Sequence, residues 1–394
     1  MTKIGVLRRA CPGLVVLSLA VAGCDHDPAA IADTWLEINA TTTGAAFDAD
    51  DYVVLMDGVE IERRLGPMDT LWVPGEPGQT IELELTDVAG NCQVDGAPRR
   101  SVTLAEGSTT SASFAVHCVA PAGIEYARLV FATGSCSVYL MFLMESCDLY
   151  TLPLDGSEGR LLTADGRSFQ PAISADGSTI AFTRQSFDPG PLPRADLYAV
   201  DVDGGNPRRI TDDGLSWDPS WSPEGTRIVY VHGVMYPDQL QIRRLDNEDV
   251  LSLQTSSMCE APVWSPDGSR IAFSSWGGGS GGIYTVAPDG GEAVLVAARG
   301  HGAVWSPTSD RLAYEIDGSV YVIGLNDDAG TRLLPGSQLT PWTPTDWSPN
   351  GEWIALTRQT TRGQDVYLLH VDDGNLVRVT LNHRSNSAVF LPGT

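Results

Sequence analysis

One short segment recurs five times at a nearly constant spacing, and this repeat constrains the fold more than any other feature of the chain. Its fullest form is Pro-Val-Trp-Ser-Pro-Asp-Gly at residues 262–268, and close copies occupy residues 219–225 and 345–351. Weaker copies lie at 171–177, where Ile replaces Trp, and at 303–307. The anchor positions, 41 to 48 residues apart, are Ile173, Trp221, Trp264, Trp305 and Trp347. This period fits a unit of four short strands.

The residues that follow each copy predict the other strands of such a unit. Within the copy, Pro fixes φ and Gly supplies the positive φ that a tight turn needs, so the Trp strand ends there. In the fullest copy a second strand follows at 271–273 and a third at 283–284, and an acidic-Gly turn comes next at Asp289-Gly290. A fourth strand is expected at places such as 209–211 and 377–379. Each unit therefore corresponds to one blade of a β-propeller.

The two ends of this region supply complementary fragments. Residues 129–131 and 148–150 resemble a second and a third strand without a first, and residues 386–391 resemble a first strand without followers. Phe390 lies 43 residues after Trp347, which agrees with the period. Joining the fragments gives a sixth blade and removes open sheet edges. The sequence thus predicts an all-β chain with a six-bladed propeller over residues 124–394.

The Trp-Ser-Pro-Asp-Gly copies resemble the TolB-type β-propeller repeat, also called PD40 or WD40-like. The resemblance covers about two thirds of the chain, whereas the dipeptides of WD40 itself are out of register here. It implies protein interaction instead of chemistry. We expect the anchor tryptophans Trp221, Trp264, Trp305 and Trp347 to pack between blades.

The N-terminus has the pattern of an export signal. Residues 1–23 combine basic residues with an apolar run that ends in Val-Ala-Gly before Cys24. This junction resembles the bacterial lipobox, which implies diacylation of Cys24, with residues 24–29 as tether. The alternative is an ordinary signal peptide that is cut nearby. The first interpretation places the protein in the bacterial cell envelope, lipid-anchored, on the periplasmic or outer surface.

Residues 30–120 show alternating runs at Tyr52–Met56, Ile81–Leu85 and Ser113–His117, which predict a small β-sandwich. The segment from 88 to 118 resembles an immunoglobulin-like or PEGA-like module of exported lipoproteins, and the helical pattern of the α/β N-terminal domain of TolB is missing.

The cysteines that remain after export can form two local pairs in an oxidising compartment, Cys92 with Cys118 and Cys136 with Cys147, which leaves Cys259 over. The second pair would enclose the apolar residues 138–144, as a hairpin or as a docking surface.

Charge and motifs exclude several functions. The formal net charge of -25 disfavours nucleic acid as a partner. The only lysine, Lys3, lies in the leader, which excludes Schiff-base chemistry and a Walker phosphate loop in the exported chain. Residues 278–282 match the hydrolase elbow only formally, since no strand–turn–helix context surrounds them. We assign no catalytic residue, no metal ligand set and no cofactor.

Polar side chains that vary among the copies are expected where the innermost strands begin, at one mouth of the channel. They are Gln170, Asp218, Glu260, His301 and Asn386, with Trp217 and Trp342 nearby. Carboxylates with an imidazole could hold a divalent cation or a polar ligand, and a hydrated polar rim without a ligand is the alternative.

These observations favour an exported, lipid-anchored, non-enzymatic protein whose propeller binds a protein or peptide partner in the cell envelope. The alternative is a metal-dependent carbohydrate-active or hydrolytic enzyme that works at the channel mouth. A third hypothesis is a passive structural lipoprotein without a stable partner.

Overall fold

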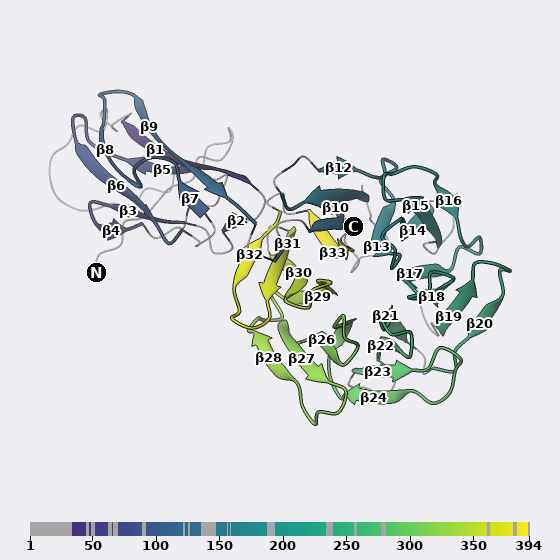
Figure 1. The fold of residues 1–394 in the computed structure, drawn as a ribbon. Helices are drawn as coiled ribbons and strands as arrows, with labels where there is room; N and C mark the ends of the chain where they lie inside the picture. The colour runs from purple at the N-terminus through teal and green to yellow at the C-terminus, as the bar shows by residue number, and fades with distance from the viewer. Residues whose placement is uncertain are drawn as a thin grey trace. The chain divides into compact units, whose positions relative to one another are not determined.

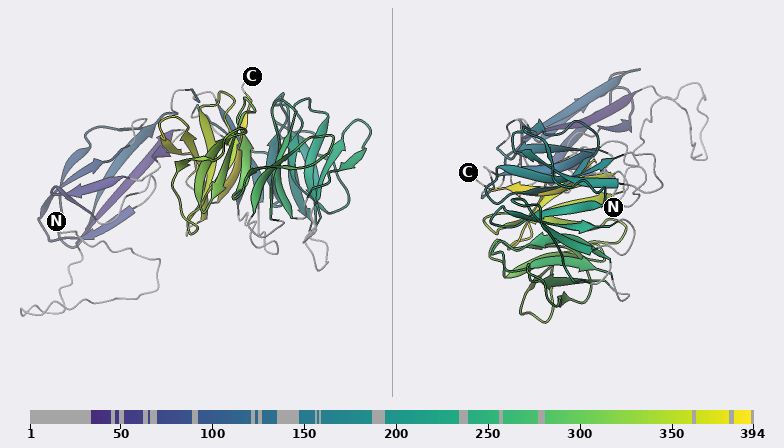
Figure 2. Two further views of the ribbon diagram at one scale, coloured as in Figure 1. Left: turned by 90° about the horizontal axis from the view of Figure 1, so that it is seen from below. Right: turned by 90° about the vertical axis from the view of Figure 1, so that its right-hand side faces the viewer.

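The chain is built from strands and turns (Figures 1 and 2). The computed structural model describes residues 34–44, 47–48, 52–61, 65, 70–88, 92–120, 123–124, 127–134, 147–155, 157, 159–186, 194–233, 239–255, 258–276, 281–360, 363–380 and 384–392. The leader, Cys24 and Cys136 lie outside these residues. None of the described segments is a helix long and apolar enough to span a membrane. The chain divides into two compact units between Ala120 and Pro121.

The described residues of the N-terminal unit form two four-stranded sheets. The first has the order β5 (Thr70–Pro74), β1 (Trp35–Gly44), β9 (Thr109–Cys118) and β7 (Cys92–Val94). The second has the order β4 (Val59–Glu60), β3 (Val53–Met56), β6 (Thr80–Thr86) and β8 (Arg99–Thr103). A two-residue strand, β2, covers Phe47–Asp48.

Side chains from both sheets share one buried core, because alternate residues of each strand point inward. Leu36 and Ile38 of β1 are buried with Leu83 of β6 and Phe114 of β9. The three predicted runs correspond to β3, β6 and β9, but β1 was missed in the sequence. It pairs in parallel with β9 over ten residues. The two sheets, packed on this shared core, form a β-sandwich.

A disulfide joins Cys92 to Cys118 in this unit. The two residues lie directly opposite each other in the pairing of β7 with β9. The bond therefore fixes the short edge strand β7 to β9, one of the two ten-residue strands of its sheet.

The C-terminal unit contains six sheets among the described residues. The sheet that joins both ends of the unit, here the terminal sheet, has the order β12 (Arg160–Leu161), β11 (Cys147–Pro153), β10 (Arg128–Gly134) and β33 (Ser385–Leu391). The second sheet contains β13 (Ser168–Ile173), β14 (Thr179–Ser186), β15 (Arg194–Asp201) and β16 (Arg208–Arg209). The third contains β17 (Ser216–Trp221), β18 (Arg227–His232), β19 (Gln239–Arg244) and β20 (Val250–Ser252).

The remaining three sheets continue this order along the chain. The fourth contains β21 (Cys259–Trp264), β22 (Ile271–Ser275), β23 (Gly282–Val286) and β24 (Val294–Ala297). The fifth contains β25 (His301–Trp305), β26 (Arg311–Ile316), β27 (Ser319–Gly324) and β28 (Thr331–Leu334). The sixth contains β29 (Trp342–Trp347), β30 (Trp353–Thr360), β31 (Gly363–His370) and β32 (Leu376–Arg378). Figure 1 shows the six sheets around a common axis, with β33 innermost in the terminal sheet and the first strand innermost in the others.

The terminal sheet combines distant parts of the chain. β33 pairs antiparallel with β10, and Leu129 lies opposite Phe390. The last strand of the chain therefore supplies the innermost strand of the sheet to which β10 and β11 belong, as the sequence predicted.

The repeated Ser-Pro-Asp-Gly turn is held by its own side chains. The Ser265 hydroxyl donates to Asp267 Oδ1 at 2.6 Å and accepts the Arg270 N–H at 3.0 Å. The Gly268 N–H donates to the Ser265 carbonyl, and Gly268 has a φ of 74°. Ser, Asp and Gly thus recur because they shape the hairpin.

The anchor tryptophans are buried, and each contacts the preceding sheet. The indole N–H groups of Trp221 and Trp305 donate to the carbonyls of Ala172 and Val263. The Arg227 guanidinium lies 4.7 Å from the ring centre of Trp264. Arg311 lies in the same way over Trp347, at 5.2 Å. These contacts agree with the expected role of the tryptophans in packing between sheets.

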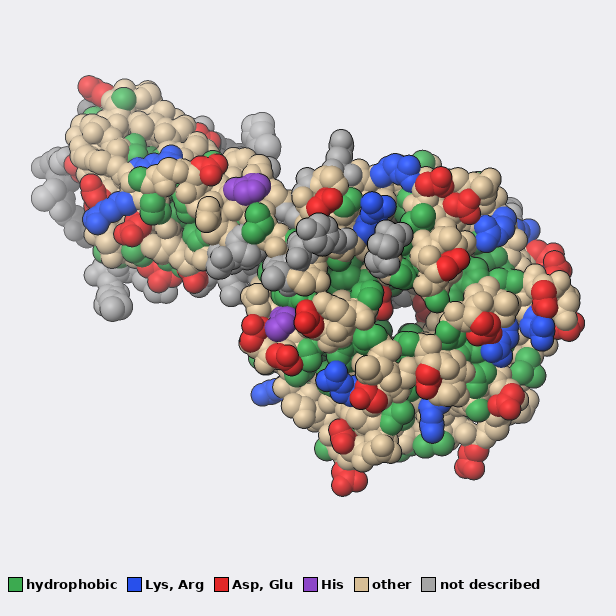
Figure 3. Space-filling model, viewed as in Figure 1, with side chains coloured by type: hydrophobic (Ala, Val, Ile, Leu, Met, Phe, Trp, Pro, Cys, Tyr) green, Lys and Arg blue, Asp and Glu red, His purple; other side chains and the backbone are tan. Residues whose placement is uncertain are grey.

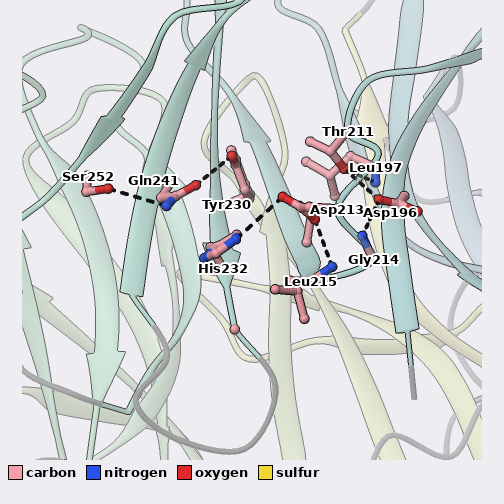
Figure 4. A network of polar contacts seen from close by, with 12 residues as sticks. Asp196, Leu197, Thr211, Asp213, Gly214, Leu215, Tyr230, His232, Gln241 and Ser252 are labelled. Carbon is pink, nitrogen blue, oxygen red and sulfur yellow. Dashed lines mark hydrogen bonds and ion pairs between the residues drawn. The ribbon is translucent and has the colours of Figure 1, made fainter. Parts of the chain in front are cut away.

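A second repeated element joins the third strand of a sheet to the fourth (Figure 4). Asp196, on β15, accepts the Gly214 N–H at 2.9 Å and pairs with Arg209 at 2.7 Å. Thr211 donates to Asp196 and accepts the Leu197 N–H. The sixth sheet repeats this arrangement with Asp365, Arg378 and Thr380. Asp196 and Asp365, near the start of the third strand in their sheets, are therefore structural.

Candidate functional site

The innermost strands of the six sheets enclose a cavity of about 360 Å³. Residues from β13, β17, β21, β25, β29 and β33 all contribute to its wall. Figure 3 shows the opening in the middle of the C-terminal unit. Prolines and the tryptophans Trp221 and Trp264 supply apolar surface, and the charged residues among the described lining are Asp218 and Asp346.

A β-bulge near the start of the innermost strands determines which residues face this cavity. Pairing with the second strand shifts register just before the anchor position in the second to fifth sheets. The residue three positions before the anchor has a positive φ in five strands, at Gln170 (53°), Asp218 (52°), Ala261 (48°), Gly302 (62°) and Ser387 (53°). All five residues line the cavity. The bulge thus directs one position per sheet toward the axis.

The structure corrects the single ring of mouth residues expected from the sequence. Gln170 and Asp218 lie three positions before their anchors and line the cavity, whereas Glu260, His301 and Asn386 lie four positions before theirs and do not. Ala261, Gly302 and Ser387 take the lining position instead, as given above. Residue type alone does not show which of two adjacent strand residues faces the cavity, because adjacent side chains of a strand point in different directions.

The two aromatic candidates also lie outside the cavity lining. The Trp217 indole donates to the Gly233 carbonyl at 3.1 Å and its ring lies 6.2 Å from that of Phe169. Trp342 is 5% exposed, and the Arg358 guanidinium lies 4.5 Å from the centre of its ring. Both tryptophans are therefore packing residues.

The remaining candidate, Asn386, is also engaged in packing. It is 4% exposed, and its amide donates to Gln364 Oε1 at 2.5 Å. This bond links β33 to β31, so Asn386 holds the last strand against the sixth sheet.

Hydrogen bonds between neighbouring sheets surround the cavity. The N–H groups of Asp218, Gly302 and Ser387 donate to hydroxyls on the second strand of the preceding sheet, which belong to Thr183, Ser274 and Thr357. The fourth sheet differs, because the corresponding residue, Val231, has no hydroxyl. There the Ala261 N–H donates to the Asp218 carboxylate at 3.3 Å.

The contact between the fifth and sixth sheets breaks this pattern. Pro344 occupies the lining position in the sixth sheet and has no N–H to donate. On the fifth sheet, Glu315 occupies the position that Thr183, Ser274 and Thr357 occupy on their own sheets. The Glu315 carboxylate therefore accepts no hydrogen bond from the residue at the lining position of the next sheet, Pro344. It instead contacts His301 Nε2 and accepts the N–H of Gly318.

Asp218 is the candidate that the structure places most directly in the cavity. Its surroundings remove water from the carboxyl group, and Glu260 lies close enough to add a like charge. Together these effects raise its pKa to about 6, against the lowering effect of hydrogen bonds with Ala261 and Gln170. Asp218 therefore changes its charge close to neutral pH.

Asp346 was missed in the sequence. Burial raises its pKa to about 7, although its carboxylate accepts the N–H groups of Phe390 at 2.7 Å and Trp347 at 2.8 Å. A signal was present, since the residue just before the anchor is Asp in this copy only. The other copies have Ala172, Ser220, Val263, Val304 and Val389 at that position.

Four side chains form a second polar group, here called the rim cluster: Glu260, Trp276, His301 and Glu315. Burial lowers the pKa of His301, but its bond to Glu315 and the charges of Glu315 and Glu260 outweigh this and raise it. The Trp276 indole donates to Glu260 Oε1 at 2.8 Å, and its ring lies 5.8 Å from that of His301. Trp276 is 41% exposed. Since Glu260 also acts on Asp218, the rim cluster adjoins the cavity.

The described residues contain no group of three or more His, Cys, Asp or Glu side chains positioned to hold a metal ion. The predicted cation site at the mouth thus lacks a converging set of ligands in this part of the chain.

The remaining cysteines lie away from the cavity lining. Cys147 is disulfide-bonded, and its predicted partner Cys136 falls outside the described residues. Cys259 is buried at the start of β21.

Comparison with known families agrees with this architecture. Residues 102–309, more than half of the chain, match the family described as the TolB β-propeller domain, PD40. The chain belongs to the TolB β-propeller domain family. The family match ends before the copy of the repeat at 345–351, which the sequence and the sheet order nevertheless show.

Solved structures support the same fold for this PD40 protein. TolB from Acinetobacter baumannii superposes with a TM-score of 0.59 at 17% identity, covering 81% of each chain. A putative TolB from Agrobacterium tumefaciens gives 0.50 at 13% identity, covering 64% of this chain and 88% of that one. A chain of a nidogen/laminin complex gives 0.54 at 13% identity, covering 68% and 99%. At these identities the likeness shows the fold alone. No curated protein matched the sequence.

Proposed function

We propose that this PD40 protein is an exported, lipid-anchored, non-enzymatic binding protein of the bacterial cell envelope. In this proposal its six C-terminal sheets are the blades of a closed propeller over residues 124–394, and β33 completes the ring. Residues 1–23 are the leader, Cys24 is the lipidated residue, residues 24–29 are the tether, and the sandwich of residues 30–120 is an immunoglobulin-like or PEGA-like spacer. The ligand is a protein or peptide partner.

One observation carries the proposal. The turn residues and tryptophans that build each sheet repeat, whereas the residues that line the axial cavity differ from sheet to sheet. Because the side chains around the cavity differ from sheet to sheet, they can recognise a ligand that does not itself repeat six times. The match to the TolB β-propeller domain family agrees with a binding role.

The test is capture of a partner from envelope extract by the full chain and by a triple variant, Asp218→Ala, Glu260→Ala and His301→Ala. A control triple variant, Asp289→Ala, Glu292→Ala and Asp328→Ala, changes exposed residues between third and fourth strands, away from the cavity lining. We expect a partner that the wild type and the control retain and the first variant loses. Equal capture by all three proteins, or none by any, would contradict the proposal.

A second candidate function rests on the rim cluster. The contact between His301 and the buried Glu315 resembles the pairing that orients an imidazole for general-base chemistry, which suits a carbohydrate-active or hydrolytic enzyme at the mouth. This candidate predicts a bound divalent metal and loss of activity in Asp218→Ala and in His301→Ala. Metal analysis of the purified protein, with assays on acidic oligosaccharides, decides between the two functions.

A further inference from the structure

The axial cavity is lined by acidic groups, and no basic side chain stands beside them in its described lining. Its described lining includes the carboxyl groups of Asp218 and Asp346 and no Arg or His side chain. The charge of Glu260, which has the same sign, acts on Asp218 and raises its pKa. Among the described residues, Asp346 accepts the backbone N–H groups of Trp347 and Phe390. Two partly desolvated carboxylates without an opposite charge favour a cation from outside.

The shape and chemistry of the wall restrict the kind of cation. No three ligating side chains converge in the described part of the chain, so the arrangement does not suit a bare metal ion. Pro171, Pro219, Pro262 and Pro344 provide apolar surface beside the carboxyl groups. An apolar stem that ends in a positive charge, as in arginine and lysine, matches both features. The volume, about 360 Å³, is close to the lower limit of about 300 Å³ for ligand sites.

The rim cluster extends this chemistry to the mouth. Trp276 is exposed, and Glu260 accepts its indole N–H, which leaves a ring face and a carboxylate side by side. An aromatic face attracts a guanidinium or ammonium group. The protein itself uses the same contact between Arg227 and Trp264 and between Arg311 and Trp347. The net charge of -25 adds long-range attraction for a basic segment.

We propose that the cavity receives a cationic side chain, arginine or lysine, from an extended segment of the protein partner. The side chain passes Trp276 and Glu260 and places its charge against Asp218 and Asp346. This inference rests on the proposed function, because it specifies the chemistry of the partner at the same site.

The direct test uses small probes that differ in charge and not in shape. The full chain, with ¹³C-labelled aspartate carboxyl groups, is titrated with n-butylguanidinium and separately with n-butylurea. We expect n-butylguanidinium to shift the Asp218 and Asp346 resonances saturably and to lower both titration midpoints, and n-butylurea to do neither. Equal binding of the two probes, or no saturable shift with n-butylguanidinium, would overturn the proposal.

Variants locate the binding. The double variant Asp218→Asn and Asp346→Asn should bind n-butylguanidinium at least about tenfold more weakly, while Asp289→Asn with Glu292→Gln should bind like wild type. Since Asp346 also holds β33, thermal unfolding verifies that the double variant is folded, and Asp218→Asn alone serves if it is not. Unchanged affinity in the folded variant would contradict the assignment of the site.

The capture experiment separates this inference from the proposed function. If the partner is retained by the Asp218→Asn, Asp346→Asn variant as by wild type, the proposed function stands and the cationic contact is wrong. If n-butylguanidinium binds at the two aspartates but no partner is captured, the proposed function fails, and a protein segment is excluded as the source of the cation.

Discussion

The two ends of each innermost strand follow different rules. At the end that leads into the hairpin, Ser265, Asp267 and Gly268 bond to one another, and the same residue types recur in the other copies with few changes. At the other end, the bulge presents Gln, Asp, Ala, Gly or Ser to the cavity. The first end is determined by the hairpin, which every sheet needs, and the second is free to vary once the bulge is formed.

The difference teaches where stability and recognition lie in such a repeat. At the hairpin end, some hydrogen bonds join neutral groups and others involve exposed carboxylates. Asp267 is an example: hydrogen bonds from Ser265 and Ser269 stabilise its charged form and lower its pKa. At the cavity end, Asp218 and Asp346 have raised pKa values. Charge thus favours the fold at the hairpin end and opposes it at the cavity end.

The largest expected effect is at an anchor. Trp264→Ala removes a buried side chain that packs between the third and fourth sheets, and we expect it to lower the free energy of unfolding by about 3–5 kcal/mol. Urea unfolding of the variant and of wild type measures this. Trp276→Ala, which changes an exposed tryptophan, is the matched control and should cost far less. Equal losses would remove the distinction between packing and rim tryptophans.

The second prediction concerns pH. The pKa of each carboxyl group is higher in the folded chain than its ordinary value of 3.8. The stability that results is fully present below pH 3.8 and is lost as the pH rises to the pKa of the folded state. Asp218 loses its contribution between about pH 4 and 6, and Asp346 between about pH 4 and 7. For each carboxyl group, the change in the free energy of unfolding is about 1.4 kcal/mol for every pKa unit between the folded and the ordinary value.

Unfolding free energies of wild type and of Asp218→Asn with Asp346→Asn, measured from pH 4 to 8, check this prediction. The variant should lose less stability than wild type as pH rises over this range. Parallel curves for the two proteins would show that neither carboxyl group has a raised pKa in the folded chain.

The third prediction tests the hairpin end. Ser265→Ala removes the acceptor for the Arg270 N–H and the donor to Asp267, and should cost about 1–2 kcal/mol. Thermal unfolding measures the change, and Ser387→Ala, at the cavity end of β33, is the control, since its side chain makes no described bond of this kind. A larger loss of stability in Ser387→Ala would show that the cavity end contributes more to stability than the hairpin end.

Much of the fold could be predicted because its determinants are local. The period of the copies located the innermost strands, and the fragments at 129–131 and 386–391 predicted the pairing of β10 with β33. The parallel strand β1 was missed, because its partner β9 lies about 70 residues further along the chain and no turn connects them.

The site was predicted less well, because it depends on a register that the sequence does not display. Asp218 was assigned to the mouth correctly in position, but Glu260 and His301 were placed in the same row although the bulge separates them. Asp346 was overlooked because it belongs to a copy that otherwise repeats well. The pairing of Glu315 with His301 depends on Pro344, which removes the backbone donor from the next sheet, and no local pattern in the sequence reports this relation between sheets.

The smallest predicted effect sharpens the comparison at the contact between the fifth and sixth sheets. Arg311→Met keeps the apolar stem over Trp347 but removes the positive charge, and should lower the free energy of unfolding by about 0.5–1 kcal/mol. The matched control is Arg299→Met, since Arg299 is exposed, pairs with Asp317, and has no aromatic ring beneath it among the described residues. Urea unfolding of both variants separates the contributions. If Arg299→Met costs as much, the guanidinium over the indole adds nothing specific, and the tryptophan itself accounts for the packing between sheets.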